Sequence, residues 1–152
     1  MLLCYTYKAR RKANMQLTRH TDYAFRVLIY LASQEAQDLT TIQDISSCFD
    51  ISKNHVMKVV QTLVKAGFVH SVRGQSGGLR LACAPDVINV RKVIEATETV
   101  LAPVNCKVPV CRLAQNCQLQ GVLFQAQEAY LASVAQYTLA DLVRSQPMKT
   151  LL

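Results

Sequence analysis

Residues 41–67, TIQDISSCFDISKNHVMKVVQTLVKAG, decide the fold because they encode two short amphipathic helices joined by a tight turn. Thr41 is followed three residues later by Asp44, a pattern that predicts a capping box at the start of the first helix. Ser52 predicts the N-cap of the second helix, and Gly67 is the residue type that ends a helix. The stretch therefore predicts a helix-turn-helix.

The chain that follows changes from helical to strand periodicity. Residues 68–73 and 79–83 read as two strands, and the connection between them, GQSGG, is rich in glycine. This pattern predicts a β-hairpin. A hairpin directly after the second helix makes a wing, so the expected fold class is mainly α with a small β-hairpin wing, a winged helix-turn-helix domain.

The charge of the chain is concentrated on these elements. Seventeen Lys and Arg residues against ten Asp and Glu give a net charge of +7, and residues 53–80 hold five bases and no acid. Such a surface suits the phosphates of double-stranded DNA, whereas a solvated basic face without a partner is the alternative. We favour DNA because the charges lie on a helix-turn-helix. The predicted contacts are Ser52, Lys53, Asn54, His55 and Lys58 on the second helix, and Arg73, Gly74, Gln75, Ser76 and Arg80 on the wing.

Further helices are predicted at Thr21–Gln34, Asn89–Glu98 and Gln118–Gln136. The last is apolar and almost free of charge, so we expect it to be a dimerisation helix; packing back on its own domain is the alternative. The expected segments are an N-terminal extension (1–14), the winged DNA-binding domain (15–99), a cysteine loop (100–118), the dimerisation helix with a capped C-terminal turn (119–143) and a tail (144–152).

Residues 1–14, MLLCYTYKARRKAN, place an apolar patch before a basic cluster, which is the reverse of a secretory signal. They read as a disordered basic arm or as residues upstream of a start at Met15, and we favour the second because helical periodicity begins only after Met15. Apolar residues make up 51% of the chain, but no run of eighteen lacks a charge. We expect a soluble cytoplasmic protein without a membrane segment.

Three of the six cysteines, Cys106, Cys111 and Cys117, are separated by four and then five residues in a stretch where prolines disfavour regular structure. We call these three the cysteine triad. The other three are scattered, and we interpret Cys48 and Cys83 as small buried hydrophobic residues.

The triad has four chemical interpretations. A disulfide with one free thiol is disfavoured in a reducing cytosol. Structural zinc needs four ligands, and because no His, Asp or Glu lies between Glu98 and Glu128, a zinc site would be one ligand short. A thiol-based redox switch stays open, because Lys107 and Arg112 favour thiolates. The fourth is an iron-sulfur cluster, whose usual ligands are thiolates and whose negative charge the same cations would offset.

A cluster on the triad would need its fourth ligand from a distant segment, another subunit, a small molecule or solvent. The incompletely protected iron would be open to a diatomic gas or an oxidant. We therefore interpret the triad as a sensor and not as a source of structural stability.

Three motifs give the chain a resemblance to a known family. Residues 15–26, MQLTRHTDYAFR, the wing sequence RGQSGGLR at 73–80 and the triad spacing resemble, in the same order, the bacterial winged-helix iron-sulfur regulators. Within that family, Asn105 before the first cysteine and YTLADLV at 137–143 are most similar to the nitric-oxide-sensing repressors. Members that control cluster assembly carry a histidine three residues after the last cysteine, where this chain has Gln120.

The resemblance implies a homodimer that binds operator DNA and represses genes while an iron-sulfur cluster, either 2Fe-2S or 4Fe-4S, is intact. Nitric oxide would nitrosylate the iron and so release the DNA. The resemblance also implies that Asp22 of the other subunit is the fourth ligand. The residues alone explain Asp22 as a first-turn carboxylate that the helix dipole favours.

Two other functions stay open. One is a regulator of the same fold that senses oxidants or iron-sulfur status through the same cysteines, and the other is a winged-helix module that binds a protein instead of DNA. An enzyme is not expected, because the sequence offers no CxxC motif, nucleophile–base pair or nucleotide-binding loop.

Overall fold

The computed structural model describes residues 16–35, 38–74, 76–114 and 116–144. Its elements are α1 (Arg19–Ser33), α2 (Ile42–Phe49), α3 (Lys53–Lys65), β1 (Val69–Val72), β2 (Gly78–Leu81), α4 (Val90–Thr97), α5 (Gln118–Val134) and α6 (Leu139–Arg144). The predictions made for residues 1–14, for Gln75 and for residues 145–152 of the tail lie outside the described residues.

Helices α2 and α3 begin where the sequence predicts, whereas α1 begins at Arg19, two residues before the predicted Thr21. Thr18 and Ser52 are the N-caps of α1 and α3, and the side chain of each accepts a hydrogen bond from a backbone N–H three residues on. At α2 the capping box is complete, because Thr41 accepts from the Asp44 N–H while Asp44 accepts from the Thr41 N–H. Hydrogen bonds from Thr41 hold the pKa of the Asp44 carboxyl below its ordinary value. Asn89 caps α4 in a similar way.

The end of α3 leads directly into the hairpin. Gly67 has a positive φ of 80°, which glycine adopts without a steric penalty. Its N–H donates to the Val64 carbonyl (3.1 Å), and the Phe68 N–H donates to the Leu63 carbonyl (2.9 Å). This pair of bonds is a Schellman motif, so the predicted helix end at Gly67 is confirmed and β1 can start two residues later.

Strands β1 and β2 form an antiparallel hairpin in which Val69 pairs with Leu81 and Val72 pairs with Gly78. Leu79 of β2 also exchanges two backbone hydrogen bonds with Thr40, which attaches the wing to the segment that leads into α2. A Cβ atom on Gly77 would lie 2.3 Å from the Val72 carbonyl oxygen, so the wing can turn there only with glycine.

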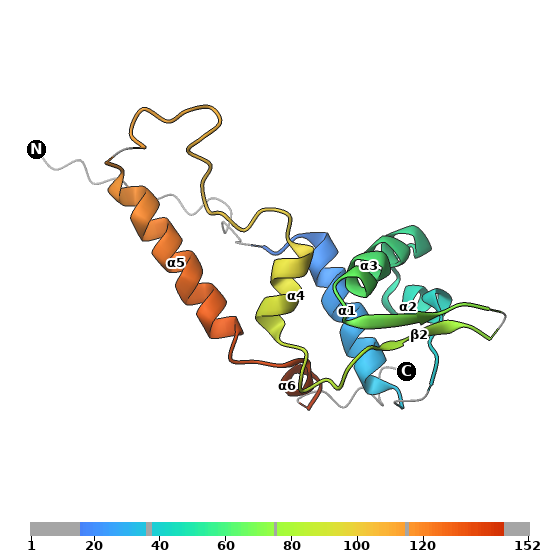
Figure 1. The fold of residues 1–152 in the computed structure, drawn as a ribbon. Coiled ribbons are helices and arrows are strands. Elements are labelled where there is room, and N and C mark those ends of the chain that lie inside the picture. Colours follow the sequence, from blue (N-terminus) through green and yellow to red (C-terminus); the bar gives the residue numbers. More distant parts are fainter. Residues whose placement is uncertain (1–15, 36–37, 75, 115, 145–152) are drawn as a thin grey trace, which may run out of the picture.

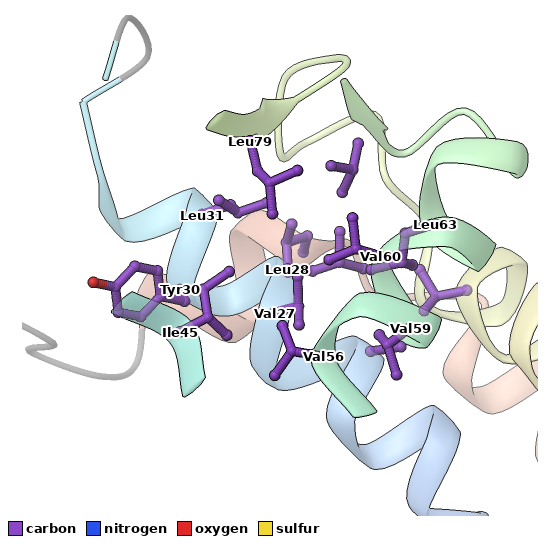
Figure 2. Close-up of a cluster of buried hydrophobic side chains, with 14 of the residues drawn as sticks. Val27, Leu28, Tyr30, Leu31, Ile45, Val56, Val59, Val60, Leu63 and Leu79 are labelled. Atoms are coloured by element: carbon purple, nitrogen blue, oxygen red, sulfur yellow. The ribbon is translucent and has the colours of Figure 1, made fainter. Parts of the chain in front are cut away.

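One hydrophobic core joins α1, α2, α3 and the hairpin, and Figure 2 shows its central side chains. Leu28 of α1, Ile45 of α2 and Leu63 of α3 have no exposed surface. A buried aliphatic side chain of this size stabilises a fold by about 1.5–3 kcal/mol. The core fixes the two helices of the helix-turn-helix against α1, so the outer face of α3 is presented from a rigid base.

A second, smaller cluster connects α4 to α5. It consists of Val90, Ile94 and Leu131, with Leu101 and Phe25 among the side chains packed against it. Phe25 of α1 also packs against the main core, so it touches both clusters. The second cluster is therefore continuous with the winged domain.

Most of α5 lies away from the rest of the molecule (Figure 1). Leu131 is its buried residue, whereas Leu119 and Val122 are 64% and 59% exposed. At its C-terminal end the helix is bonded to the residue before α4, because the Asn89 side-chain N–H donates to the Ala135 carbonyl at 2.7 Å. The apolar helix predicted from the sequence is thus present, and Leu119 and Val122, which we call the uncovered stripe, are exposed in one chain.

After α5 the chain returns to the winged domain. Thr138 caps α6 through two hydrogen bonds to the Asp141 carboxylate, as the sequence predicted for this turn. Leu139 is 1% exposed and belongs to the main core. The C-terminal turn is therefore part of the packing around α1, which the sequence pattern did not reveal.

Candidate nucleic-acid interface and cysteine loop

The start of α3 presents an exposed polar surface. Val56, Val59, Val60 and Leu63 are buried on one side of the helix, which turns the opposite side to solvent. The predicted contact residues of this helix are all exposed: Ser52, Lys53, Asn54, His55 and Lys58. The helix dipole adds a partial positive charge at this end, so the surface suits an anionic partner.

His55 is held in place by two neighbours. Its Nδ1 lies 3.0 Å from the Ser52 hydroxyl oxygen, and its ring centroid lies 6.0 Å from that of Tyr23 in α1. The Arg26 guanidinium lies 5.9 Å above the same tyrosine ring. The imidazole therefore has a defined orientation, with one ring nitrogen already engaged by the helix cap.

Sequence reasoning did not identify Tyr23 and Arg26 as neighbours of this surface. Their spacing was the available clue, since positions three apart share a helix face. Both lie outside the buried stripe formed by Ala24, Val27 and Leu28. The packing of α1 against α3, which no local pattern encodes, brings them beside His55.

The wing provides a second exposed basic region. Arg73, Gly74, Ser76 and Arg80 are exposed, and Arg80 stands opposite His70 in the hairpin register. Gly74 has a φ of 122°, so the turn uses a conformation that few other residues adopt. The fifth residue predicted for the wing, Gln75, lies outside the described part.

Asp22 lies in a cleft of about 810 Å³ between the start of α1 and the turn that joins α2 to α3. Its side chain is 47% exposed and forms an ion pair with Arg26 (Oδ2 to Nη2, 2.9 Å). Arg19 and Tyr23 also line the cleft. The carboxylate therefore has a structural partner within its own helix and is still reachable from solvent.

The cysteine triad lies on the long connection from α4 to α5, where the described residues form turns and no helix or strand. All three thiols are free and half-buried. A turn joins the first two, because the Cys111 N–H donates to the Cys106 carbonyl (3.0 Å). Asn105 shapes the same turn by accepting from the Lys107 N–H through its side chain (3.0 Å). Cys117 stands at the N-cap of α5 without a side-chain capping bond.

The donor set of the triad fits an iron-sulfur cluster by its chemistry. It offers three thiols and no competing carboxylate or imidazole between residues 99 and 127. Among the described residues, no group of three or more His, Cys, Asp or Glu side chains is gathered as a metal-binding set. The structure therefore shows the donors on one loop but does not bring them together, with or without Asp22.

Cys48 and Cys83 have a different environment. Both are partly buried and pack against the main core. This agrees with their interpretation as small hydrophobic residues.

Within the described part of the chain, no helix combines the length and the hydropathy needed to cross a lipid bilayer.

Comparison with known proteins gives a family and close relatives. Residues 17–145 match the Rrf2 family, described as iron-dependent transcriptional regulators. The HTH-type transcriptional regulator NsrR of Bacillus licheniformis (strain ATCC 14580) is 44% identical over 135 residues, covering 87% of this chain and 94% of the relative.

Solved structures agree on the fold. CymR, the global cysteine regulator of B. subtilis, superposes with a TM-score of 0.69 at 24% identity over 88% of this chain and 99% of CymR. IscR of T. potens superposes with a TM-score of 0.71 at 21% identity over 87% of this chain and 88% of IscR. The prediction of a mainly helical winged helix-turn-helix fold is thereby confirmed.

Proposed function

The chain belongs to the Rrf2 family of transcriptional regulators, so it is a regulator and not an enzyme, and we propose that it is a nitric-oxide-sensitive repressor. In this proposal a homodimer binds operator DNA while the cysteine triad holds an iron-sulfur cluster, and nitric oxide releases the DNA. The observation that carries the proposal is the triad of free thiols in a chain 44% identical to a regulator named NsrR.

The exposed face of α3 is the proposed reading surface. Asn54, His55 and Lys58 project from the side of α3 that carries no core residue, which supports contact with base edges in the major groove. Arg73 and Arg80 on the wing would bind phosphates or the minor groove. Two recognition helices in a dimer would meet half-sites about 34 Å apart, or a multiple of that distance.

The uncovered stripe of α5 supports a homodimer. Leu119 and Val122 are more than half exposed and lie three positions apart, on one face of the helix, and burying such side chains is favourable. A second copy of α5 would cover them and would also fix the distance between the two recognition helices. A change in the cysteine loop beside α5 could then alter that distance.

Cys106, Cys111 and Cys117 would hold the cluster, with Asp22 of the second copy proposed as a fourth ligand. When bound, the group supplies iron that reacts with nitric oxide. The cations Lys107 and Arg112 on the same loop would offset the negative charge of a thiolate-ligated centre. The half-buried thiols are accessible enough for a small diatomic molecule to reach this region.

The test starts from protein purified without oxygen. We expect iron and acid-labile sulfide in the preparation, together with visible absorption that nitric oxide bleaches. The variant Cys111→Ser should lose most of the iron, whereas Cys83→Ser, a matched thiol outside the loop, should keep it. Colourless wild-type protein would contradict the proposal of a cluster. If peroxide then changed the DNA affinity of that protein reversibly, the result would support a thiol-based redox switch instead.

DNA binding is tested separately on the same preparation. We expect tight, salt-dependent binding to a palindromic operator that is at least about a thousandfold stronger than non-specific binding, and weaker after nitric oxide. Equal affinity for operator and unrelated DNA would contradict the repressor and favour a winged-helix module that binds protein.

A further inference from the structure

Glu98 connects the cysteine loop to the winged domain. It is the C-cap of α4 and the residue from which the connection to the triad departs. Its Oε1 accepts two hydrogen bonds from Thr18, one from the backbone N–H (2.8 Å) and one from the hydroxyl (3.1 Å). These bonds join residues 80 positions apart in the sequence. In Figure 1 the loop leaves α4 at the end where α1 begins.

The contact completes the N-terminal cap of α1. The Thr18 hydroxyl oxygen accepts from the Thr21 N–H (3.3 Å), and its hydrogen is donated to Glu98. The hydroxyl is therefore used both as an acceptor and as a donor, and it also lies 3.2 Å from the Thr21 hydroxyl oxygen. The negative charge also lies at the end of α1 where the helix dipole favours an anion.

The first turns of α1 in turn position the recognition helix. Tyr23, less than two turns after Thr18, makes the ring contact with His55 of α3, and α1 and α3 pack against each other in the main core. Asp22 occupies the same segment and forms its ion pair with Arg26. A shift at the α1 cap would therefore move Tyr23 and, through the ring contact, His55, one of the side chains proposed to read DNA.

The charge of Glu98 also acts on a residue of α5. Burial raises the pKa of the Tyr130 phenol, and the nearby Glu98 carboxylate raises it further. Three residues after Glu98, Leu101 packs against the second hydrophobic cluster, as Phe25 of α1 does. The start of the cysteine loop is thus tied to α1 by a polar contact and by a shared apolar cluster.

We propose that Glu98 is a positioning residue that transmits the state of the cysteine loop to α1 through Thr18, and thereby to the recognition helix. This inference rests on the proposed function, since the loop changes state only if the triad holds a reactive group. Glu98 touches neither DNA nor the triad in this role. Its contribution is to the ratio between the DNA affinities of the two states, and not to either affinity alone.

The test compares operator affinity before and after nitric oxide in anaerobically purified protein. In wild-type protein we expect a ratio of about tenfold or more, a usual size for coupling between two sites. In Glu98→Ala the ratio should fall below about threefold while iron content and the visible spectrum stay at wild-type values. Glu98→Gln keeps an acceptor oxygen for Thr18 and should restore most of the ratio.

The matched control is Glu95→Ala. Glu95 carries the same charge on the same helix, but it accepts its hydrogen bonds from Arg91 (2.6 Å) and Lys92 (3.4 Å) within α4. This variant should keep the wild-type ratio. Thr18→Ala should lower the ratio as Glu98→Ala does, and the double variant should lower it no further, because both remove one contact.

A second measurement does not depend on the cluster. In cluster-free protein, amide hydrogen exchange in the first turn of α1 should be at least about tenfold faster in Glu98→Ala than in wild type, because the cap is weakened. Equal exchange in the two proteins would overturn the inference. An unchanged affinity ratio in iron-loaded Glu98→Ala would also overturn the inference about Glu98, but it would not contradict the proposed function. Wild-type protein that binds no iron would overturn both.

Discussion

In α1, Ala24, Val27 and Leu28 have no exposed surface, whereas in α5 Leu119 and Val122 are 64% and 59% exposed. The winged domain buries its apolar residues against its own elements, and every helix of it has a neighbour in the main core. The arm, which we define as residues 99–134, consists of a connection without described helix or strand and of a helix that contacts the domain near one end. The domain covers its apolar side chains through its own contacts, whereas the arm leaves Leu119 and Val122 exposed, which a second copy would cover in the proposed homodimer.

The strongest test of this difference compares two leucines. Leu28→Ala should lower the free energy of unfolding by about 2–5 kcal/mol, because it leaves a cavity in the main core. Leu119→Ala should change it by no more than about 0.5 kcal/mol in dilute, monomeric protein. Urea denaturation at low protein concentration measures both. Similar losses in the two variants would mean that the arm packs on its own domain.

The second test concerns the partner of the arm. Val122→Glu places a charge on the uncovered stripe and should weaken dimerisation by about 1.5–3 kcal/mol per side chain, the value of burying an aliphatic residue. The control is Val87→Glu, since Val87 is 69% exposed but lies before α4 in the winged domain. Sedimentation equilibrium gives the dissociation constants. An unchanged dissociation constant for the Val122 variant would contradict the role of α5 as a dimerisation helix.

A third test asks which surface of the winged domain meets DNA. Lys58→Ala and Arg80→Ala should each reduce the slope of log affinity against log salt by about 0.9, the value for one phosphate contact. Lys92→Ala is the control, because Lys92 lies on α4 and pairs with Glu95. Fluorescence anisotropy between low and moderate salt measures the slopes. A smaller salt slope in the Lys92 variant would indicate that the DNA-binding surface includes α4, on the side of the arm.

The smallest expected effect concerns the cap of α2. The folded state lowers the pKa of Asp44, so its stabilisation is present above the unfolded pKa of about 3.9 and is lost as the pH falls through the folded value. Because the carboxylate is exposed, Asp44→Asn should cost only about 0.5 kcal/mol at neutral pH. Unfolding curves between pH 3 and pH 7 should therefore converge at low pH. A constant difference would show that the charge is irrelevant.

Local chemistry was enough to predict most of the winged domain. The caps at Thr41 and Ser52 and the helix end at Gly67 depend on residues within four positions, so the sequence alone contains them. The core faces of α1 and α3 followed from helical periodicity for the same reason. The exposed stripe of α5 was also visible, because the helix is apolar and has no charged face in its first half.

Contacts between distant residues could not be predicted in this way. Leu139 in the main core, Tyr23 beside His55 and Glu98 on Thr18 each depend on how separate helices pack. No periodicity or spacing in one sequence encodes such pairs. The candidate site shows the same division: the exposed residues of α3 were predictable, whereas their fixation by α1 was not.

The two ends of the arm are both attached to the winged domain. Glu98 and Leu101 hold the departing chain, and the bond from Asn89 to the Ala135 carbonyl holds the returning one. The segment between them can therefore change in length during evolution without altering the winged domain, since longer loops add little entropic cost. A change in the spacing of the three cysteines would therefore leave the packing of the winged domain as it is.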